Sequence, residues 1–387
     1  MTALPRGFTA YVANLGVKDE TDDFVVIAAD TPVAAAGVFT RSIFAGPSVT
    51  ASRVHVADRR AQAMVVVSKN ANVANGPDGD DDNRAVVAAV ARQLGCDQTD
   101  VLIASTGVIG RRYPIDRMLH GIGLMPPTLP DSDIDGAARG IMTTDTVPKI
   151  AERTVADSAA RIVGIAKGSG MIEPHMATMI AVVVTDADVD STELGAQFTR
   201  VADQTFNCIS VDTDSSTSDT AVVLASGAAG PVDSASFEQA LFGVARDLAK
   251  QIVRDGEGAE KLIEVHVDEA RDGAQAKRVA KAIVNSPLVK TAVHGADPNW
   301  GRVAMAIGKC DGDDDRDIDP DHVVIRFGEQ RMYPDRASDE ALDALSKYLA
   351  GDEILIHVSL GTGKESCTVW GCDLTDGYIR INADYTT

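Results

Sequence analysis

Residues 167–187 read KGSGMIEPHMATMIAVVVTDA and join a loop of glycine and proline to an apolar strand. Almost every residue of MIAVVVT, 179–185, is apolar, and a strand with this pattern is buried on both of its faces. Such a strand needs other elements to cover it on each side. Helical and strand patterns interleave along the rest of the chain. The sequence therefore predicts a mixed α/β protein whose central sheet is covered by helices.

Several segments carry the start, stop and spacing signals of helices. NRAVVAAVARQLG, 83–95, ends at a glycine, and the segment 236–258 repeats apolar residues on one helical face before it stops at Gly256. In DPNWGRVAMAIGKC, Asp297 is expected to cap a helix whose first residue is Pro298. The remaining apolar runs, such as KLIEVHV and EILIHVSL, predict strands.

Composition excludes several functional classes. The chain has 387 residues and a net charge of −21, which argues against binding to nucleic acid or to anionic membranes. No apolar run approaches the roughly 18 residues of a membrane span, and the N-terminus lacks the pattern of a signal peptide. The chain has five cysteines, an odd number and a small one for its length, so they do not indicate a disulfide framework. We expect a cytoplasmic protein.

Two acidic segments, DGDDDNR at 78–84 and DGDDDRDIDPD at 311–321, raise the possibility of calcium binding. The first fails the EF-hand register, because Asn83 stands where glycine is needed and Ala89 where glutamate is needed. The second fails in the same way, so both segments are predicted to be solvated surface. No histidine pair has zinc spacing and no dinucleotide or phosphate fingerprint is complete. We therefore expect neither a metal nor a cofactor.

The junction Ala177-Thr178 suits a nucleophile that is activated by chain cleavage. A threonine hydroxyl is a weak nucleophile and needs an adjacent base. If the chain is cut before Thr178, the new α-amine, with a pKa near 7.7–8.0, becomes that base. Gly168 and Gly170 permit unusual backbone geometry nearby, and Ala177 is small. The alternative is a buried strand that simply begins with threonine.

Motifs throughout the chain resemble the ornithine acetyltransferase family, which comprises glutamate N-acetyltransferases of the N-terminal-nucleophile type. They occur in family order over essentially the whole sequence: GFTAYVANLGVK, VVVSKNANVANG, IASTGVIGR, IMTTDT, KGSGMIEPHMATMIA, DTDSSTSDTAV, DGEGAEKLIEV, NSPLVKTAVHGADPNWGRVAMAIGK, GCDLTDGYIRIN and NADYTT. Two stretches look closer to the paralogues of clavulanic-acid-type clusters: FTRSIFAGPSV, and DTDSSTSD with a serine where asparagine is more usual.

The resemblance implies roles for individual residues. Thr178 matches the family nucleophile, and Ala177-Thr178 matches the bond at which the chain cleaves itself. Thr106 and Gly107 match the pair that stabilises the oxyanion of a tetrahedral intermediate.

The resemblance also implies a substrate site. Lys167 matches a lysine that suits an α-carboxylate, and Glu257 matches a substrate-binding acid. Thr143, with Thr144 as the adjacent alternative, matches a further contact. The two C-terminal contacts of the family fall on Asn382 and Thr387.

The implied reaction is a ping-pong transfer of acetyl from N-acetylornithine to glutamate in arginine biosynthesis, without a cofactor. The implied fold is an αββα sandwich core, residues 1–272, with a smaller C-terminal α/β domain, residues 273–387. Cleavage would give chains 1–177 and 178–387, which are expected to associate as α2β2 or larger.

Three rival functions remain open from the sequence. A self-cleaving aminopeptidase shares the overall fold but uses serine and water, whereas Thr178 and DPNWGR favour a transferase. Use of acetyl-CoA as a second donor is an additional activity of some family members. A non-catalytic acidic binding module would have no need for Thr178.

Overall fold

The chain folds as two compact units, and each is built on its own sheet. The structure is a computed structural model that describes residues 2–130, 133–173, 179–310, 312, 315–335 and 337–384. The first unit holds the residues up to Asn207 together with Asp214–Leu248, and the second holds Cys208–Thr213 and the residues from Ala249 onward. The expected division lies later, between residues 272 and 273. The strand before it, residues 262–270, pairs within the second sheet and so belongs to the second unit.

The first sheet contains eight strands among the described residues, in the order β4-β3-β2-β9-β7-β6-β5, with β1 beside β2. Their bounds are β1 Phe8–Ala13, β2 Phe24–Phe39, β3 Arg60–Val67, β4 Val101–Ser105, β5 Lys149–Thr154, β6 Arg161–Lys167, β7 Ile180–Asp188 and β9 Thr220–Pro231. β7 runs parallel to β9 and antiparallel to β6.

The long strand β2 belongs to both halves of this sheet. Its first part pairs with β1 and β3, its register shifts between Ala28 and Val33, and its last part pairs with β9. Alternate residues of both halves share one apolar core, which includes Ile27 and Val66 from one half and Val182 from the other. The two halves are therefore two sheet layers that pack face to face.

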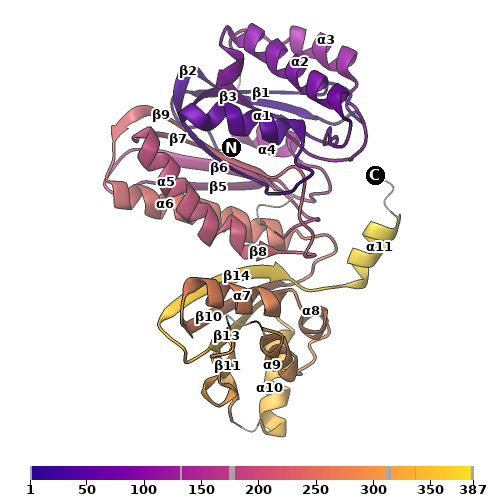
Figure 1. Ribbon diagram of the computed structural model, residues 1–387, viewed down its shortest axis with the longest axis vertical. Coiled ribbons are helices and arrows are strands. Elements are labelled where there is room, and N and C mark those ends of the chain that lie inside the picture. The colour runs from indigo at the N-terminus through magenta and orange to yellow at the C-terminus, as the bar shows by residue number, and fades with distance from the viewer. Residues whose placement is uncertain are drawn as a thin grey trace. The chain divides into compact units, whose positions relative to one another are not determined.

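Helices cover the two outer faces of these layers, as Figure 1 shows for α2, α3, α5 and α6. The helices of the first unit are α1 Pro47–His55, α2 Pro77–Leu94, α3 Ile115–Gly123, α4 Ile134–Gly140, α5 Ser191–Gln204 and α6 Ser234–Arg254, whose last turns enter the second unit. α2 and α3 pack on the opposite face of β2, β3 and β4. The layer order is helix, sheet, sheet, helix, so the expected αββα core is confirmed.

The segment 179–185 forms the buried strand that its sequence predicts. Every residue from Ile180 to Ala187 is buried, because one face of β7 points into the shared core and the other lies under helices. Short 3₁₀ turns elsewhere connect the main elements: Val56–Asp58, Gln98–Asp100, Phe206–Cys208 and Pro320–His322.

The second unit is a six-stranded sheet in the order β12-β11-β13-β10-β14-β8. Its strands are β8 Ile209–Ser210, β10 Leu262–Ala270, β11 Val324–Phe327, β12 Gln330–Tyr333, β13 Glu353–Ser359 and β14 Glu365–Cys372. Its helices are α7 Gly273–Val284, α8 Pro287–His294, α9 Gly301–Gly308, α10 Asp339–Leu349 and α11 Asp376–Asp384.

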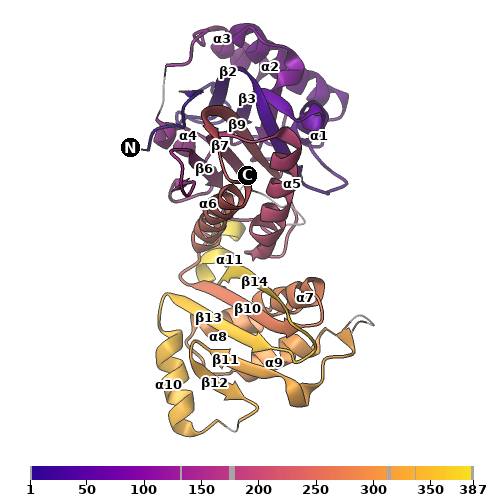
Figure 2. The same cartoon turned by 90° about the vertical axis from the view of Figure 1, so that its left-hand side faces the viewer.

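The two faces of the second sheet differ in polarity. Val265 and Val267 of β10 are fully buried, and α7 packs against β10 and β14. Glu264, His266 and Asp268 alternate with these valines along the strand, so they point to the other face, and they are only half-buried. Figure 2 shows β10 and β13 side by side in this sheet.

The first acidic segment is helical rather than a loop, although Asp78, Asp80 and Asp81 are exposed, as a solvated surface requires. Residues 77–94 form one helix, α2, so the segment is its first turns. Asp82 is 3% exposed and binds Arg112 with both carboxylate oxygens, at 3.0 and 2.8 Å. In the described part of the second segment Asp317, Asp319 and Asp321 are exposed, whereas Asp315 is buried and binds Arg278. Acidic residues at a helix N-terminus are favourable, and a paired carboxylate can be buried.

Within the described ranges, no helix is both long enough and apolar enough to span a bilayer.

Gly164 of β6 tests how closely α6 packs on the first sheet. A Cβ at this position would lie 2.8 Å from Leu248 Cδ1 and 3.0 Å from Val244 Cγ1, and both side chains are fully buried. We expect Gly164→Ala to lower the free energy of unfolding by about 1–3 kcal/mol, seen as a lower Tm. Gly195→Ala is the control, because its methyl meets only Ala36 Cβ at 4.0 Å in a helix that favours alanine. Equal losses in both variants would contradict this packing.

Candidate active site

Thr106 and Gly107 form a tight turn directly after β4. The Thr106 amide donates to the Val67 carbonyl at 3.0 Å, and the residue is 1% exposed. Gly107 has φ 133°, and a Cβ there would lie 2.2 Å from the Lys69 carbonyl carbon and 2.5 Å from the Asn70 nitrogen. Only glycine fits this position, because the neighbouring atoms belong to the backbone.

The Gly107 amide is available as a hydrogen-bond donor. Within the described part of the chain it donates to no group, and the residue is exposed. The segment against which it packs is strained, since Lys69, Asn72 and Ala74 all have positive φ. Asn70 braces this segment by donating from Nδ2 to the Arg112 carbonyl at 3.1 Å. A fixed, unpaired N–H is what an oxyanion hole requires.

Lys167 lies beside this turn at the end of β6. Its Nζ is 3.4 Å from Thr106 Oγ1, a long hydrogen bond, and the side chain is 2% exposed. The structure thus brings together two residues that are 61 positions apart in sequence and that the sequence assigns to one site.

Asp145 organises the segments on either side of Lys167. Its Oδ1 accepts from Lys149 Nζ and from the Gly168 amide, each at 2.7 Å, and its Oδ2 accepts from the Thr143 amide at 3.0 Å. Burial opposes ionisation, but the charges of Lys167 and Lys149 and the Gly168 hydrogen bond keep the pKa of Asp145 below its ordinary value. The carboxylate therefore fixes the turn after Lys167 and the loop of Thr143 together.

The two neighbouring threonines of this loop, Thr143 and Thr144, make different contacts. Thr143 is half-buried and is positioned through its backbone, whereas the Thr144 hydroxyl lies 2.6 Å from Ser169 Oγ. Thr143 is thus the member whose hydroxyl is not committed to Ser169. The choice between the two as substrate contact stays a prediction.

Asp219 is a second buried acid that the sequence reasoning missed. Its Oδ1 accepts from the Met179 amide at 2.9 Å, and no group in the described ranges donates to its Oδ2. The side chain is fully buried, and desolvation raises its pKa well above the ordinary value despite the Met179 hydrogen bond and the charge of Lys167. Met179 directly follows Thr178, so Asp219 holds the peptide group next to the predicted nucleophile.

Three predicted site residues lie outside the described residues: Ala177, Thr178 and Thr387. Their roles stay predictions. On the N-terminal side of the gap, the Glu173 amide donates to the Asp214 carbonyl at 2.9 Å.

Glu257 and Asn382 meet in the second unit. Asn382 Nδ2, on α11, donates to Glu257 Oε2 at 2.9 Å. The next residue, Gly258, has φ 69°, and a Cβ there would lie 2.3 Å from the Tyr378 nitrogen. Thr375 Oγ1 also donates to the Gly258 carbonyl at 2.6 Å. Because residue 258 is a glycine, α11 approaches closely enough for the Asn382 side-chain amide to reach the Glu257 carboxylate.

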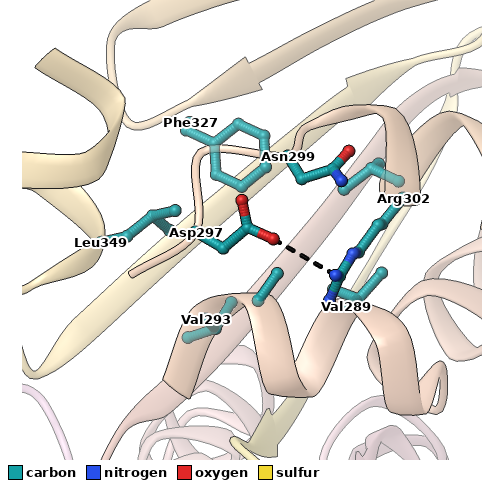
Figure 3. A pocket seen from close by; sticks show the side chains of 9 residues that line it. Val289, Val293, Asp297, Asn299, Arg302, Phe327 and Leu349 are labelled. Atoms are coloured by element: carbon teal, nitrogen blue, oxygen red, sulfur yellow. Dashed lines mark ion pairs between the residues drawn. The ribbon is translucent and has the colours of Figure 1, made fainter. Parts of the chain in front are cut away.

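A small pocket in the second unit contains none of the predicted site residues (Figure 3). Asp297 and Arg302 form an ion pair of 3.2 Å in its wall, and its enclosed space of about 10 Å³ holds about one water molecule. The expected helix start at Pro298 is wrong, because α9 begins at Gly301. Asp297 contributes its carboxylate to Arg302 rather than to a helix cap.

Comparison with known proteins decides the family. The model of the ArgJ family matches residues 9–387. The chain belongs to the ArgJ family. An arginine biosynthesis bifunctional protein ArgJ 2 of Nostoc sp. is 56% identical over 386 residues, which cover 100% of this chain and 99% of that protein. Glutamate N-acetyltransferase Oat2 of Streptomyces clavuligerus is 54% identical over 99% of this chain and 98% of its own length.

Solved ArgJ-family structures are also similar to the chain. The arginine biosynthesis bifunctional protein ArgJ of Bacillus halodurans is 42% identical, with a TM-score of 0.48, over 52% of this chain and 96% of that chain. The ornithine acetyltransferase of Mycobacterium tuberculosis, solved with ornithine, is 31% identical, with a TM-score of 0.37, over 44% and 92%. Membership of the ArgJ family makes this chain an acyltransferase.

Replacing Gly107 tests whether the close packing of this turn is needed for activity, as distinct from the strain of a positive φ alone. Gly107→Ala should disrupt the turn, because its methyl would overlap the backbone of Lys69 and Asn70. We expect acyl transfer to fall by about 10² to 10³, as when one oxyanion donor is lost. Gly110→Ala is the matched control, since Gly110 also has positive φ, 79°, but no atom lies within 4 Å of the added Cβ. Equal turnover in the two variants would reassign Gly107 to an ordinary turn.

Because burial raises the pKa of Asp219, this residue should make the free energy of unfolding decrease as the pH rises. Between the ordinary pKa of 3.8 and its higher folded value, the folded chain retains a proton that the unfolded chain releases. Asp219→Asn removes this difference, so its Tm should fall less than that of the wild type between about pH 5 and pH 8. Asp188→Asn, at the exposed end of β7, should retain the wild-type dependence. Identical pH profiles for Asp219→Asn and the wild type would show that Asp219 is not held protonated.

Proposed function

We propose that this chain transfers acetyl from N-acetyl-L-ornithine to L-glutamate by a ping-pong mechanism through an acetyl ester on Thr178. The observation that carries the proposal is the Gly107 amide, which donates to no group in the described ranges and lies next to the buried Thr106 and Lys167 pair. The names of the relatives support the substrates, since they include arginine biosynthesis bifunctional proteins, a glutamate N-acetyltransferase and an ornithine acetyltransferase solved with ornithine.

Self-cleavage at Ala177-Thr178 prepares the nucleophile. The Thr178 hydroxyl attacks the Ala177 carbonyl, the peptide C–N bond breaks, and the resulting ester is hydrolysed by water. The products are the Ala177 carboxylate and a free Thr178 α-amine. Asp219 supports this step because it fixes the Met179 amide, which belongs to the peptide group that follows Thr178.

The first half-reaction loads the enzyme. The Thr178 amine takes the hydroxyl proton while Thr178 Oγ bonds to the acetyl carbon of N-acetylornithine. The Gly107 amide and the Thr106 hydroxyl donate to the carbonyl oxygen, which becomes negative. The C–N bond then breaks, and the proton passes from the amine to the departing α-nitrogen of ornithine.

The second half-reaction reverses these steps with another amine. The α-amine of glutamate attacks the acetyl ester, its proton passes through the Thr178 amine, and Thr178 Oγ leaves as the hydroxyl. Atoms and charges balance without any cofactor. Lys167 suits the α-carboxylate that both substrates share, since its ammonium lies beside the turn of Thr106.

Side-chain selection falls to Glu257 in this proposal, with Asn382, Thr143 and Thr387 as further contacts. Glu257 suits the terminal ammonium of ornithine. Asn382 Nδ2 donates to the Glu257 carboxylate in the structure. When glutamate binds, the Asn382 amide is proposed to rotate and to donate to the side-chain carboxylate of that substrate instead.

The cleaved chains 1–177 and 178–387 are proposed to remain one fold and to assemble as α2β2 or larger in the cytoplasm. Support comes from the sheet, because β7 hydrogen-bonds to β6 along its length. Residues 273–387 are proposed to complete the substrate site.

Acetyl-CoA is a second candidate donor. The observation that favours it is that most of the relatives at 41–56% identity, including those of Nostoc sp. and Rhodococcoides fascians, are named bifunctional. It would load the same Thr178 ester, so the proposed chemistry after loading is unchanged.

Intact mass and acetyl labelling test the proposal together. Purified wild type should show two chains, the larger beginning at Thr178, and N-acetylornithine alone should add one acetyl group to that chain. Glutamate should then remove it as N-acetylglutamate. Thr178→Ala should remain a single unlabelled chain, because it has no hydroxyl to attack.

Each other outcome has a distinct meaning. An ester that is discharged only by water indicates a hydrolase of the aminopeptidase kind. Labelling by acetyl-CoA adds the second donor. A cleaved protein that neither donor labels would refute the transferase reaction, and cleavage of Thr178→Ala at the same bond would refute the self-cleavage.

A further inference from the structure

Two imidazoles and a carboxylate meet on the half-buried face of the second sheet. His266 of β10 and His357 of β13 are direct partners in the parallel register, with ring centroids 5.1 Å apart. Asp268 follows on the same face of β10, two residues after His266. Its Oδ2 lies 2.8 Å from His357 Nε2.

The spacing of the three donor atoms fits a metal ion. One ligand atom from each of His266, Asp268 and His357 lies within 4.8 Å of the other two. Bonds of about 2.0–2.2 Å in tetrahedral geometry place donors roughly 3.3–3.5 Å apart. Side-chain rotation alone can therefore bring the donors onto one ion. We propose that these residues bind a divalent transition-metal ion of the zinc type.

The donor set decides the class of ion. Two imidazole nitrogens and one carboxylate oxygen suit zinc, cobalt or nickel, whereas calcium and magnesium prefer oxygen alone. Three protein ligands leave a fourth position for water. The sequence hides this site, because its histidines stand on strands that are far apart in the chain and show no zinc spacing.

The surroundings orient the ligands and leave them accessible. Thr368 Oγ1 lies 2.9 Å from His266 Nδ1, which directs the other ring nitrogen, Nε2, toward a ligand. The side chains of His357 and Asp268 are 26% and 30% exposed, so an ion can reach them from solvent.

Neighbouring charges already have partners. Glu264, on the same face of β10, binds Lys250 at 3.2 Å and accepts from Trp370 Nε1 at 2.8 Å. Arg326, opposite His357 on β11, donates to Ser359 Oγ at 3.3 Å. Glu264 and Arg326 are thus engaged by groups other than the three proposed ligands.

A second group of potential ligands, Glu260, His294 and Asp373, is less suitable. Asp373 Oδ1 already accepts from the Glu260 and Lys261 amides, each at 2.9 Å, and its Oδ2 lies 3.1 Å from His294 Nδ1. This carboxylate therefore serves the backbone of the second unit. Its histidine provides a matched control.

The ion would join β10 to β13 through side chains, beside the hydrogen bonds of their backbones. Binding to the folded chain alone raises stability by mass action. The site is therefore expected to raise the Tm of the second unit, and this effect is independent of acetyl transfer.

Calorimetric titration with Zn²⁺ and absorption spectra with Co²⁺ test the site on chelator-treated full-length protein. We expect one ion per chain with micromolar affinity or better, a tetrahedral cobalt spectrum, and a Tm that rises with Zn²⁺. His357→Ala should weaken binding by at least about tenfold and abolish the rise in Tm. Asp268→Asn retains a hydrogen-bonding group of the same shape and should also weaken binding.

His294→Ala should bind Zn²⁺ as the wild type does. Circular dichroism of each variant without metal checks that the fold is intact. The proposal is overturned if the wild type does not bind Zn²⁺. It is equally overturned if both His357→Ala and Asp268→Asn bind as the wild type does, or if only His294→Ala loses the ion.

Discussion

The first unit depends on the bend of a single strand. β2 shifts its register between Ala28 and Val33, so it pairs with β3 and β1 in one layer and with β9 in the next. A strand that serves two layers lets one continuous sheet enclose its own apolar core, without an edge between the halves. The turns at the ends of β4, β6 and β9 then meet in one region. Without this bend, Thr106, Lys167 and Asp219 would stand on an open sheet.

The polar groups of the candidate site are held by buried carboxylates that have little freedom to move. Asp145 accepts from three donors, Thr143, Lys149 and Gly168, and Asp219 accepts from the amide after the predicted nucleophile. A charged group in a dry interior is costly unless it is paired and hydrogen-bonded. Asp145 meets this condition through Lys149, whereas burial raises the pKa of Asp219 and so favours its neutral form. Both acids accept backbone amide hydrogen bonds in the site, while the environment shifts the pKa of Asp145 down and that of Asp219 up.

The sequence predicted the features that depend on local pattern. The apolar run 179–185 gave the buried strand, the αββα core followed from the family resemblance, and Gly107 proved to be a position where only glycine fits. The acid roles of Asp145 and Asp219 could not be found in this way, because each depends on a backbone amide from a distant segment, Gly168 for Asp145 and Met179 for Asp219. The burial of Asp82 in the acidic start of α2 escaped the sequence for a related reason, since its partner Arg112 lies beyond the helix.

The strand order has a consequence for dividing the gene. β9 and β7, which follow residue 178, lie between β2 and β6, which precede it. A chain ending before β7 would thus expose the edges of two strands, β2 and β6, and those edges invite aggregation. Fragments 1–177 and 178–387 made separately would lack each other's hydrogen-bonding partners. If the gene were split at this point, both fragments would have to be made together, because the strands of each fragment form hydrogen bonds with strands of the other in the first sheet.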